Sequence, residues 1–118
     1  MKVYLAGPMR GFDQFNFPTF LQAATDLREK GDEVISPAEH DLESGFDPTL
    51  NTLDGFDLAG AMRWDLQQIS HVDAVIVLPG WGGSEGTKKE LRQARKFLIP
   101  IYEYEDFIKE RNAREATA

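Results

Sequence analysis

The sequence predicts an α/β fold: a doubly wound, mainly parallel sheet with helices on both faces. Three observations predict it. Short apolar runs typical of buried strands alternate with segments whose apolar residues recur at helical spacing. Turn-forming pairs that contain proline stop three of the expected strands, at Gly7-Pro8, Ser36-Pro37 and Pro79-Gly80. Right-handed crossovers between such strands leave few ways to wind the chain.

The first strand is expected at residues 2–6, where an apolar run ends at a glycine and a proline. The loop after it contains one arginine and three aromatic residues. Asn16 and Pro18 are typical of a helix start, and an apolar stripe follows them as far as Gly31, so a helix is expected over residues 17–30.

A short second strand is expected at residues 33–36. Residues 38–57 then show little periodicity and many turn formers. A loop of that length in a compact domain is usually functional or mobile, so we expect a lid or an interface there. Asp57 is typical of a helix cap, and the apolar spacing after it predicts a helix that ends near His71.

The clearest strand is expected at residues 73–79, which are almost entirely apolar. A glycine-rich turn leads from it into a helix over residues 84–98. A fourth strand at residues 99–102 and a charged helix from 106 to about 115 complete the pattern. Because ligands of such sheets bind beyond the carboxyl ends of the strands, the loops at those ends are expected to form one rim.

The composition of the chain argues against several classes of partner and site. The chain has 118 residues with 13 Lys and Arg against 20 Asp and Glu, a net charge of −7. A nucleic-acid polymer needs a basic face, so we expect none as a partner. There is no cysteine, which excludes a disulfide scaffold and a thiol nucleophile, and no spacing typical of a metal site. We expect one domain over residues 1–118 without metal or cofactor.

No segment is typical of a signal peptide, and none approaches the roughly 20 apolar residues of a membrane span. We therefore expect a cytoplasmic protein with no membrane partner.

The glycine-rich stretch over residues 81–90 could bind an anion. A turn from strand to helix leaves free backbone N–H groups at the positive end of the helix, where a phosphate often binds. Arg10, Ser84 and Gly86 together make a candidate anion clamp. The alternative, that Arg10 is an ordinary solvated loop residue, stays open.

Glu90 is unusual for its position. It is the only acid between Gly86 and Tyr102, a segment with five Lys or Arg residues, yet none of these lies three or four places from it. A solvated glutamate there would be expected to have such a partner. The alternative is a surface or helix-start glutamate that the helix dipole favours.

Asp65 repeats this pattern, because its neighbours at helical spacing include no cation. Asp65 and Glu90 lie on the helices before and after the same strand, so the two carboxylates could meet. Carboxylates about 5 Å apart suit a retaining displacement at a sugar carbon. The alternative is that Asp65 caps a loop or is exposed.

The aromatic residues indicate a ligand site less clearly than Glu90 and Asp65 do. Phe12 and Phe15 could stack on a planar base, although aromatics near a helix start more often belong to the core. For Trp64 and Trp81 a core position is at least as good an interpretation. The two isolated histidines are expected to be structural.

Together these motifs resemble the nucleoside 2-deoxyribosyltransferase superfamily, particularly small bacterial and phage members related to nucleoside monophosphate N-glycosidases. The similar residues are Tyr-Leu-Ala-Gly-Pro-Met-Arg-Gly at 4–11, Met-Arg-Trp-Asp at 62–65, Asp-Ala-Val at 73–75, and Ser84-x-Gly86-Thr87-x-x-Glu90-Leu91 with Ala94. They span most of residues 3–95.

The resemblance implies a flavodoxin-like fold and a homodimer or larger homo-oligomer. It implies that Glu90 attacks the anomeric carbon and that Asp65 handles the base or its proton. The loop after the first strand and the serine-glycine turn would surround the sugar and any 5′-phosphate. The expected substrate-binding residues are Gly7, Pro8, Arg10, Phe12, Trp64, Ser84 and Gly86.

We therefore expect an enzyme that cleaves the N-glycosidic bond of a (deoxy)nucleoside or nucleoside 5′-monophosphate through a glutamate nucleophile. Hydrolysis and base transfer both stay open. One alternative is a phosphoribohydrolase of the cytokinin-activating type, whose Pro-Gly-Gly-x-Gly-Thr-x-x-Glu turn is partly similar to residues 79–90. Another is a nucleotide-binding regulatory module without turnover.

Overall fold

The computed structural model describes residues 1–117 and contains a four-stranded parallel sheet in the order β2-β1-β3-β4. The strands are β1 (Lys2–Ala6), β2 (Glu33–Ile35), β3 (Ala74–Val77) and β4 (Ile101–Glu103). This confirms the doubly wound α/β sheet. The chain moves outward from β1 to β2 and then returns past β1 to β3. The carboxyl ends of β1 and β3 therefore form the point where the winding direction changes, the usual ligand position in such sheets.

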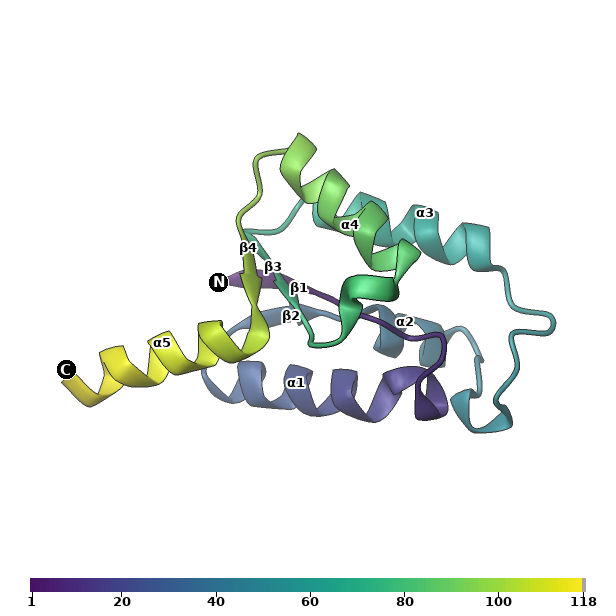
Figure 1. Ribbon diagram of the computed structural model, residues 1–118, viewed down its shortest axis with the longest axis horizontal. Helices are drawn as coiled ribbons and strands as arrows, with labels where there is room; N and C mark the ends of the chain where they lie inside the picture. The colour runs from purple at the N-terminus through teal and green to yellow at the C-terminus, as the bar shows by residue number, and fades with distance from the viewer. Residues whose placement is uncertain (118) are drawn as a thin grey trace.

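Helices cover both faces of the sheet (Figure 1). The helices α1 (Phe17–Glu29) and α5 (Tyr104–Thr117) lie on one face, and α3 (Leu58–Ile69) and α4 (Glu85–Lys96) lie on the other. Short 3₁₀ segments occur at Asp13–Asn16, Pro48–Leu50 and Trp81–Gly83. No helix within residues 1–117 is both long and apolar enough to cross a membrane.

Side chains along β1 point alternately to the two faces of the sheet and so belong to two separate hydrophobic cores. Val3 and Leu5 pack with α1 and α5, whereas Tyr4 and Ala6 pack with α3 and α4. All four side chains are fully buried. Tyr4 therefore extends from the centre of the sheet into the core beneath α3 and α4, although it carries a polar hydroxyl group.

The expectation of an irregular loop over residues 38–57 is wrong in its first part. Residues Pro37–Glu43 form a helix, α2, with Pro37 in its first turn and Ser36 at its N-cap position. Seven residues are too few to show a helical period clearly. In addition, one of its inward positions is an acid, Asp41, where an apolar residue would have revealed the stripe.

The residues that precede α1 and α3 form different hydrogen bonds. Asp57 caps α3 as expected, since its carboxylate accepts a hydrogen bond from the Gly60 backbone N–H at 2.9 Å. Asn16 precedes α1, but its side chain does not cap the helix. Its amide instead donates to the Pro8 carbonyl at 2.9 Å, which fixes the loop after β1.

The close approach of β1 to the end of β3 predicts a stability effect at Gly7. A Cβ atom at this position would lie 2.9 Å from Leu78 Cβ and 3.2 Å from Phe20 Cζ. Gly7→Ala should therefore lower the free energy of unfolding by about 1–3 kcal/mol through overpacking, as measured by urea denaturation. The matched control is Gly83→Ala, where a Cβ atom would meet nothing within 4 Å. Equal stability of the two variants would contradict the close contact.

Candidate active site

After burial itself, the charges of three acidic side chains from three helices raise the pKa of the Tyr4 hydroxyl group. They are Asp41 of α2, Asp65 of α3 and Glu90 of α4, and we call them the acid cluster. All three are buried, with relative exposures of 6%, 8% and 4%. The Tyr4 hydroxyl donates a hydrogen bond to Glu90 Oε2. The structure thus brings together Asp65 and Glu90, the two acids predicted from the sequence.

The position of Glu90 follows from the inward face of α4. The helix begins at Ser84, whose hydroxyl oxygen accepts hydrogen bonds from the Thr87 backbone N–H at 3.1 Å and the Thr87 hydroxyl at 2.9 Å. The buried residues of α4 then recur at helical spacing: Thr87, Glu90, Leu91 and Ala94. Glu90 therefore occupies a core position in an otherwise small or apolar stripe.

Asp65 faces the same core from α3, one turn before the buried Ile69. The two helices pack closely: a Cβ atom at Gly86 would lie 3.4 Å from Met62 Cε, and the Gln93 side-chain amide donates to the Leu66 carbonyl at 3.4 Å. The Oδ1 atom of Asp65 is buried without a hydrogen-bond partner among residues 1–117. Such an atom is costly to the fold, and a ligand that donates a hydrogen bond would satisfy it.

No Lys or Arg residue within the described part of the chain forms an ion pair with an acid of the cluster. Burial is the main cause that raises the pKa of Asp65 to about 7; the charge of Asp41 adds to this effect and the Tyr4 hydroxyl opposes it. Burial, followed by the charge of Asp65, also raises the pKa of Glu90 well above its ordinary value, while the Tyr4 hydrogen bond lowers it. Burial raises the pKa of Asp41 to about 6.

This arrangement can supply both a nucleophile and a proton. Tyr4 favours the ionised form of Glu90, because its hydrogen bond is stronger to a carboxylate than to a neutral acid. The pKa of Asp65, about 7, leaves a large share of this acid protonated at neutral pH, and its Oδ1 atom has no hydrogen-bond partner within residues 1–117. Two neighbouring acids in different environments are the usual basis for dividing the roles of nucleophile and acid. Residues 1–117 contain no group of three His, Asp or Glu side chains suited to hold a metal ion.

The predicted binding residues of the first loop take different positions. Gly7 and Pro8 are buried at the end of β1. Phe12 is 39% exposed, and its ring would lie 3.1 Å from a Cβ atom at Gly80, which has φ +84° and therefore favours glycine. Arg10 is exposed and forms no hydrogen bond or ion pair within residues 1–117. Within residues 1–117 the structure thus gives Arg10 no hydrogen bond to the serine-glycine turn.

The other predicted binding residues belong to α3 and to the start of α4, the helices that carry Asp65 and Glu90. Trp64 precedes Asp65 on α3 and stacks on the His40 ring, with 3.7 Å between ring centroids and 5° between the planes. This stack joins α3 to α2. Ser84 and Gly86 are half-buried at the start of α4. The Ser84 hydroxyl acts as a helix cap, and since it accepts both bonds from Thr87, its own hydrogen can still be donated to a ligand.

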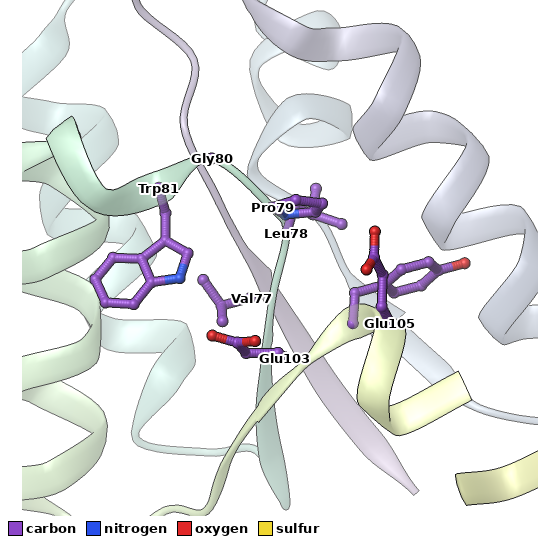
Figure 2. Close-up of a pocket in the computed structure, with 8 residues that line it drawn as sticks. Val77, Leu78, Pro79, Gly80, Trp81, Glu103 and Glu105 are labelled. Carbon is purple, nitrogen blue, oxygen red and sulfur yellow. The ribbon is translucent and has the colours of Figure 1, made fainter. Parts of the chain in front are cut away.

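Two hollows in the surface lie away from the acid cluster. One, of about 200 Å³, lies where β3 and β4 end, and Figure 2 shows Trp81 and Glu103 in its walls. The other, of about 390 Å³, is lined mainly by residues of α1 and the start of α5. Neither is lined by Asp65 or Glu90. The acids that line these hollows are Glu103 and Glu105, which are exposed, and Asp26, which is half-buried. The buried acids of the cluster are therefore better candidates for catalysis than the acids of the hollows.

Sequence reasoning missed two members of the site. Tyr4 was included in a buried strand and in the motif at residues 4–11, but without a role of its own. A hydroxyl group in an otherwise apolar strand needs a hydrogen-bond partner, and that need could have indicated its role. Asp41 counted as one acid in a loop. Its signal is weaker, because an isolated acid in a segment without visible periodicity is normally solvated.

Burial of the acid cluster predicts that stability falls as pH rises. In the unfolded chain these acids ionise at about pH 4, whereas the folded state keeps their protons to higher pH. The folded state therefore binds more protons across this window, and the free energy of unfolding should fall as pH rises from about 4 to about 7. Glu90→Gln should flatten that slope by up to about 1.4 kcal/mol per pH unit, measured by urea denaturation at each pH.

The control for this measurement is Glu29→Gln, which neutralises an exposed acid of α1. It should keep the wild-type slope. A Glu90→Gln slope equal to that of the control would contradict the burial of Glu90 as an acid with raised proton affinity.

Comparison with solved structures found a 2-deoxyribosyltransferase from the psychrotolerant bacterium Bacillus psychrosaccharolyticus, with a TM-score of 0.64. The sequences are 22% identical, and the match covers 87% of this chain and 71% of that protein. This similarity confirms the flavodoxin-like fold that the sequence motifs implied. Comparison with curated proteins found no match. The model of the family described as a domain of unknown function, DUF4406, matches residues 1–103, and the chain therefore belongs to this family.

Proposed function

We propose that the protein cleaves the N-glycosidic bond of a nucleoside or nucleoside 5′-monophosphate, with Glu90 as the nucleophile and Asp65 as the proton donor. The observation that carries this proposal is the meeting of these two buried carboxylates at the Tyr4 hydroxyl. A core has no structural need for two acids without ion-pair partners in the described chain. The cost of their burial is explained if they carry out chemistry.

In the first step Glu90 reacts in its ionised form, which the Tyr4 hydrogen bond favours against the burial that raises its pKa, and one of its oxygens bonds to C1′ of the sugar. The bond between C1′ and the base nitrogen breaks, and its electron pair leaves with the base. Asp65 gives its proton to the departing base and becomes a carboxylate. The sugar is then held as an ester of Glu90.

In the second step, Asp65 takes a proton from the acceptor that attacks C1′. If the acceptor is water, the free sugar or sugar phosphate is released; if it is a second base, a new nucleoside forms. In both cases the bond between C1′ and Glu90 breaks, Glu90 regains its negative charge and Asp65 regains its proton. One pair of acids thus serves hydrolysis and transfer.

A 5′-phosphate would bind at the start of α4. Backbone N–H groups at a helix start and the positive end of the helix dipole favour an anion, and the Ser84 hydroxyl can donate its hydrogen there. Arg10 would have to move from its exposed position to join this site. By the sequence resemblance, the enzyme would act as a homodimer or larger homo-oligomer.

Replacement of the nucleophile tests the proposal. Glu90→Gln keeps the shape of the side chain and removes its charge, so it should lower the rate of base release by about 10³-fold or more while nucleotide binding is retained. Base release is measured by chromatography and binding by calorimetry. The matched control is Glu85→Gln, an exposed acid in the first turn of the same helix, and it should keep wild-type turnover.

The substrate panel should include ribo- and deoxyribonucleosides with and without a 5′-phosphate. Mass spectrometry of wild-type protein quenched during turnover should reveal the sugar ester of Glu90. If Glu90→Gln released base at the wild-type rate, the nucleophile assignment would be wrong. Tight nucleotide binding by the wild type with no base released from any member of the panel would instead indicate a binding module.

A further inference from the structure

The turn from α4 to β4 carries two exposed apolar side chains, Phe97 and Leu98, which we call the apolar tip. Leu98 is 90% exposed, more than any other large apolar side chain of residues 1–117, and Phe97 is 46% exposed. Neither side chain belongs to the two hydrophobic cores. The packing of this chain therefore gives no reason for two large apolar residues at this turn.

Leu98 also occupies a backbone position where glycine is the usual residue. The helix α4 ends in a Schellman motif: the Leu98 N–H donates to the Arg95 carbonyl at 3.1 Å. The second bond of the motif runs from the Ile99 N–H to the Ala94 carbonyl at 2.8 Å. Leu98 has φ +57°, which is unfavourable for leucine and not for glycine. This leucine is thus both strained and solvated, and neither property stabilises the isolated chain.

Cations accompany the apolar tip on the last two turns of α4. Arg92, Arg95 and Lys96 are exposed and form no ion pair within residues 1–117. The Lys96 Nζ atom lies 5.9 Å from the centre of the Phe97 ring. In a chain of net charge −7, this turn is a local surface that is both apolar and positively charged. Its complement is an apolar surface with acids at its rim.

The two hollows described above provide such a surface. They share four lining residues, Leu78, Pro79, Tyr104 and Glu105, so we treat them as one groove at the carboxyl ends of β3 and β4. Its acids are Asp26, Glu103 and Glu105, and no Lys or Arg of the described chain lines it. Figure 2 shows Glu103 and Glu105 in its wall. The hollows measure about 200 and 390 Å³, and roughly 150 Å³ already holds a benzene-sized group.

We propose that the apolar tip of one copy of this chain docks in the groove of a second copy, with the cations of α4 against the acids of the groove. The turn that carries the tip leads into β4, and the groove lies where β4 ends (Figure 1). The tip therefore lies away from the groove of its own chain. Pairing of two tips would bring like charges together, so each copy uses two different surfaces. Such a head-to-tail contact closes into a ring or continues from copy to copy.

Sedimentation velocity over a range of protein concentrations tests the contact. Leu98→Gly removes the side chain and suits the positive φ, so it should keep or raise the melting temperature of the monomer. It should also raise the dissociation constant for self-association by about tenfold or more. The matched control is Leu50→Gly, which removes another exposed leucine, at 68% exposure, outside the apolar tip. The control should associate like the wild type.

A charge variant tests the groove. Replacement of both Glu103→Lys and Glu105→Lys places cations against the cations of the incoming α4, and it should weaken association by about tenfold or more. The matched control combines Glu29→Lys with Glu110→Lys, the same change of charge at two exposed positions outside the groove. Thermal denaturation followed by circular dichroism checks that each variant is folded.

A mixture of the two kinds of variant shows whether the contact is head to tail. Leu98→Gly keeps the groove, and the variant with lysine at 103 and 105 keeps the tip. Their equimolar mixture should form one-to-one dimers that neither variant forms alone and that do not grow further.

Wild-type protein that stays monomeric at every concentration would overturn the inference, and so would unchanged association of Leu98→Gly or an equal loss in Leu50→Gly. Loss of association that the mixture does not restore would indicate a symmetric contact and would also contradict it. The measurement needs no substrate, and neither Asp65 nor Glu90 lines the groove. Failure of the proposed function is therefore distinguishable from failure of this inference.

Discussion

The hydrogen bond from Tyr4 to Glu90 is the interaction on which the rest of the site depends. It is the only side-chain hydrogen bond that Glu90 forms within residues 1–117, and it offsets part of the cost of burying that carboxylate. It also divides the cluster into two parts. Glu90 has a donor that favours its charged form, whereas Asp65 has an oxygen without a partner.

The topology of the sheet explains why these groups meet. Tyr4 comes from the central strand β1 and faces the layer of α3 and α4 because side chains alternate along a strand. The helices that enter and leave β3 both pack on this face (Figure 1). Their inward stripes each carry one acid, and α2 adds a third from the end of β2. Residues distant in the sequence are thus brought together by the winding of a parallel sheet.

Much of this arrangement could be predicted from the sequence, because the strands and long helices have clear periods and Glu90 and Asp65 lack cations at helical spacing. The rest depends on contacts between distant segments. The helix α2 is too short to show a period, and Asp41 occupies a position where burial is visible only after α2 and α3 pack. Ser84 was expected to bind an anion, yet its first structural role is to cap α4. The spacing could not reveal that Arg10 lies exposed, because loop conformation is set by the fold.

The Tyr4 side chain has two roles, one for its ring and one for its hydroxyl group. Its ring fills the core between β1 and the α3 and α4 layer, and its hydroxyl serves the acids. A relative of this chain with phenylalanine at the same place would keep the packing and lose the donor. The residue at this position would therefore divide members of the family into those that can donate a hydrogen bond to the glutamate of α4 and those that keep only the packing.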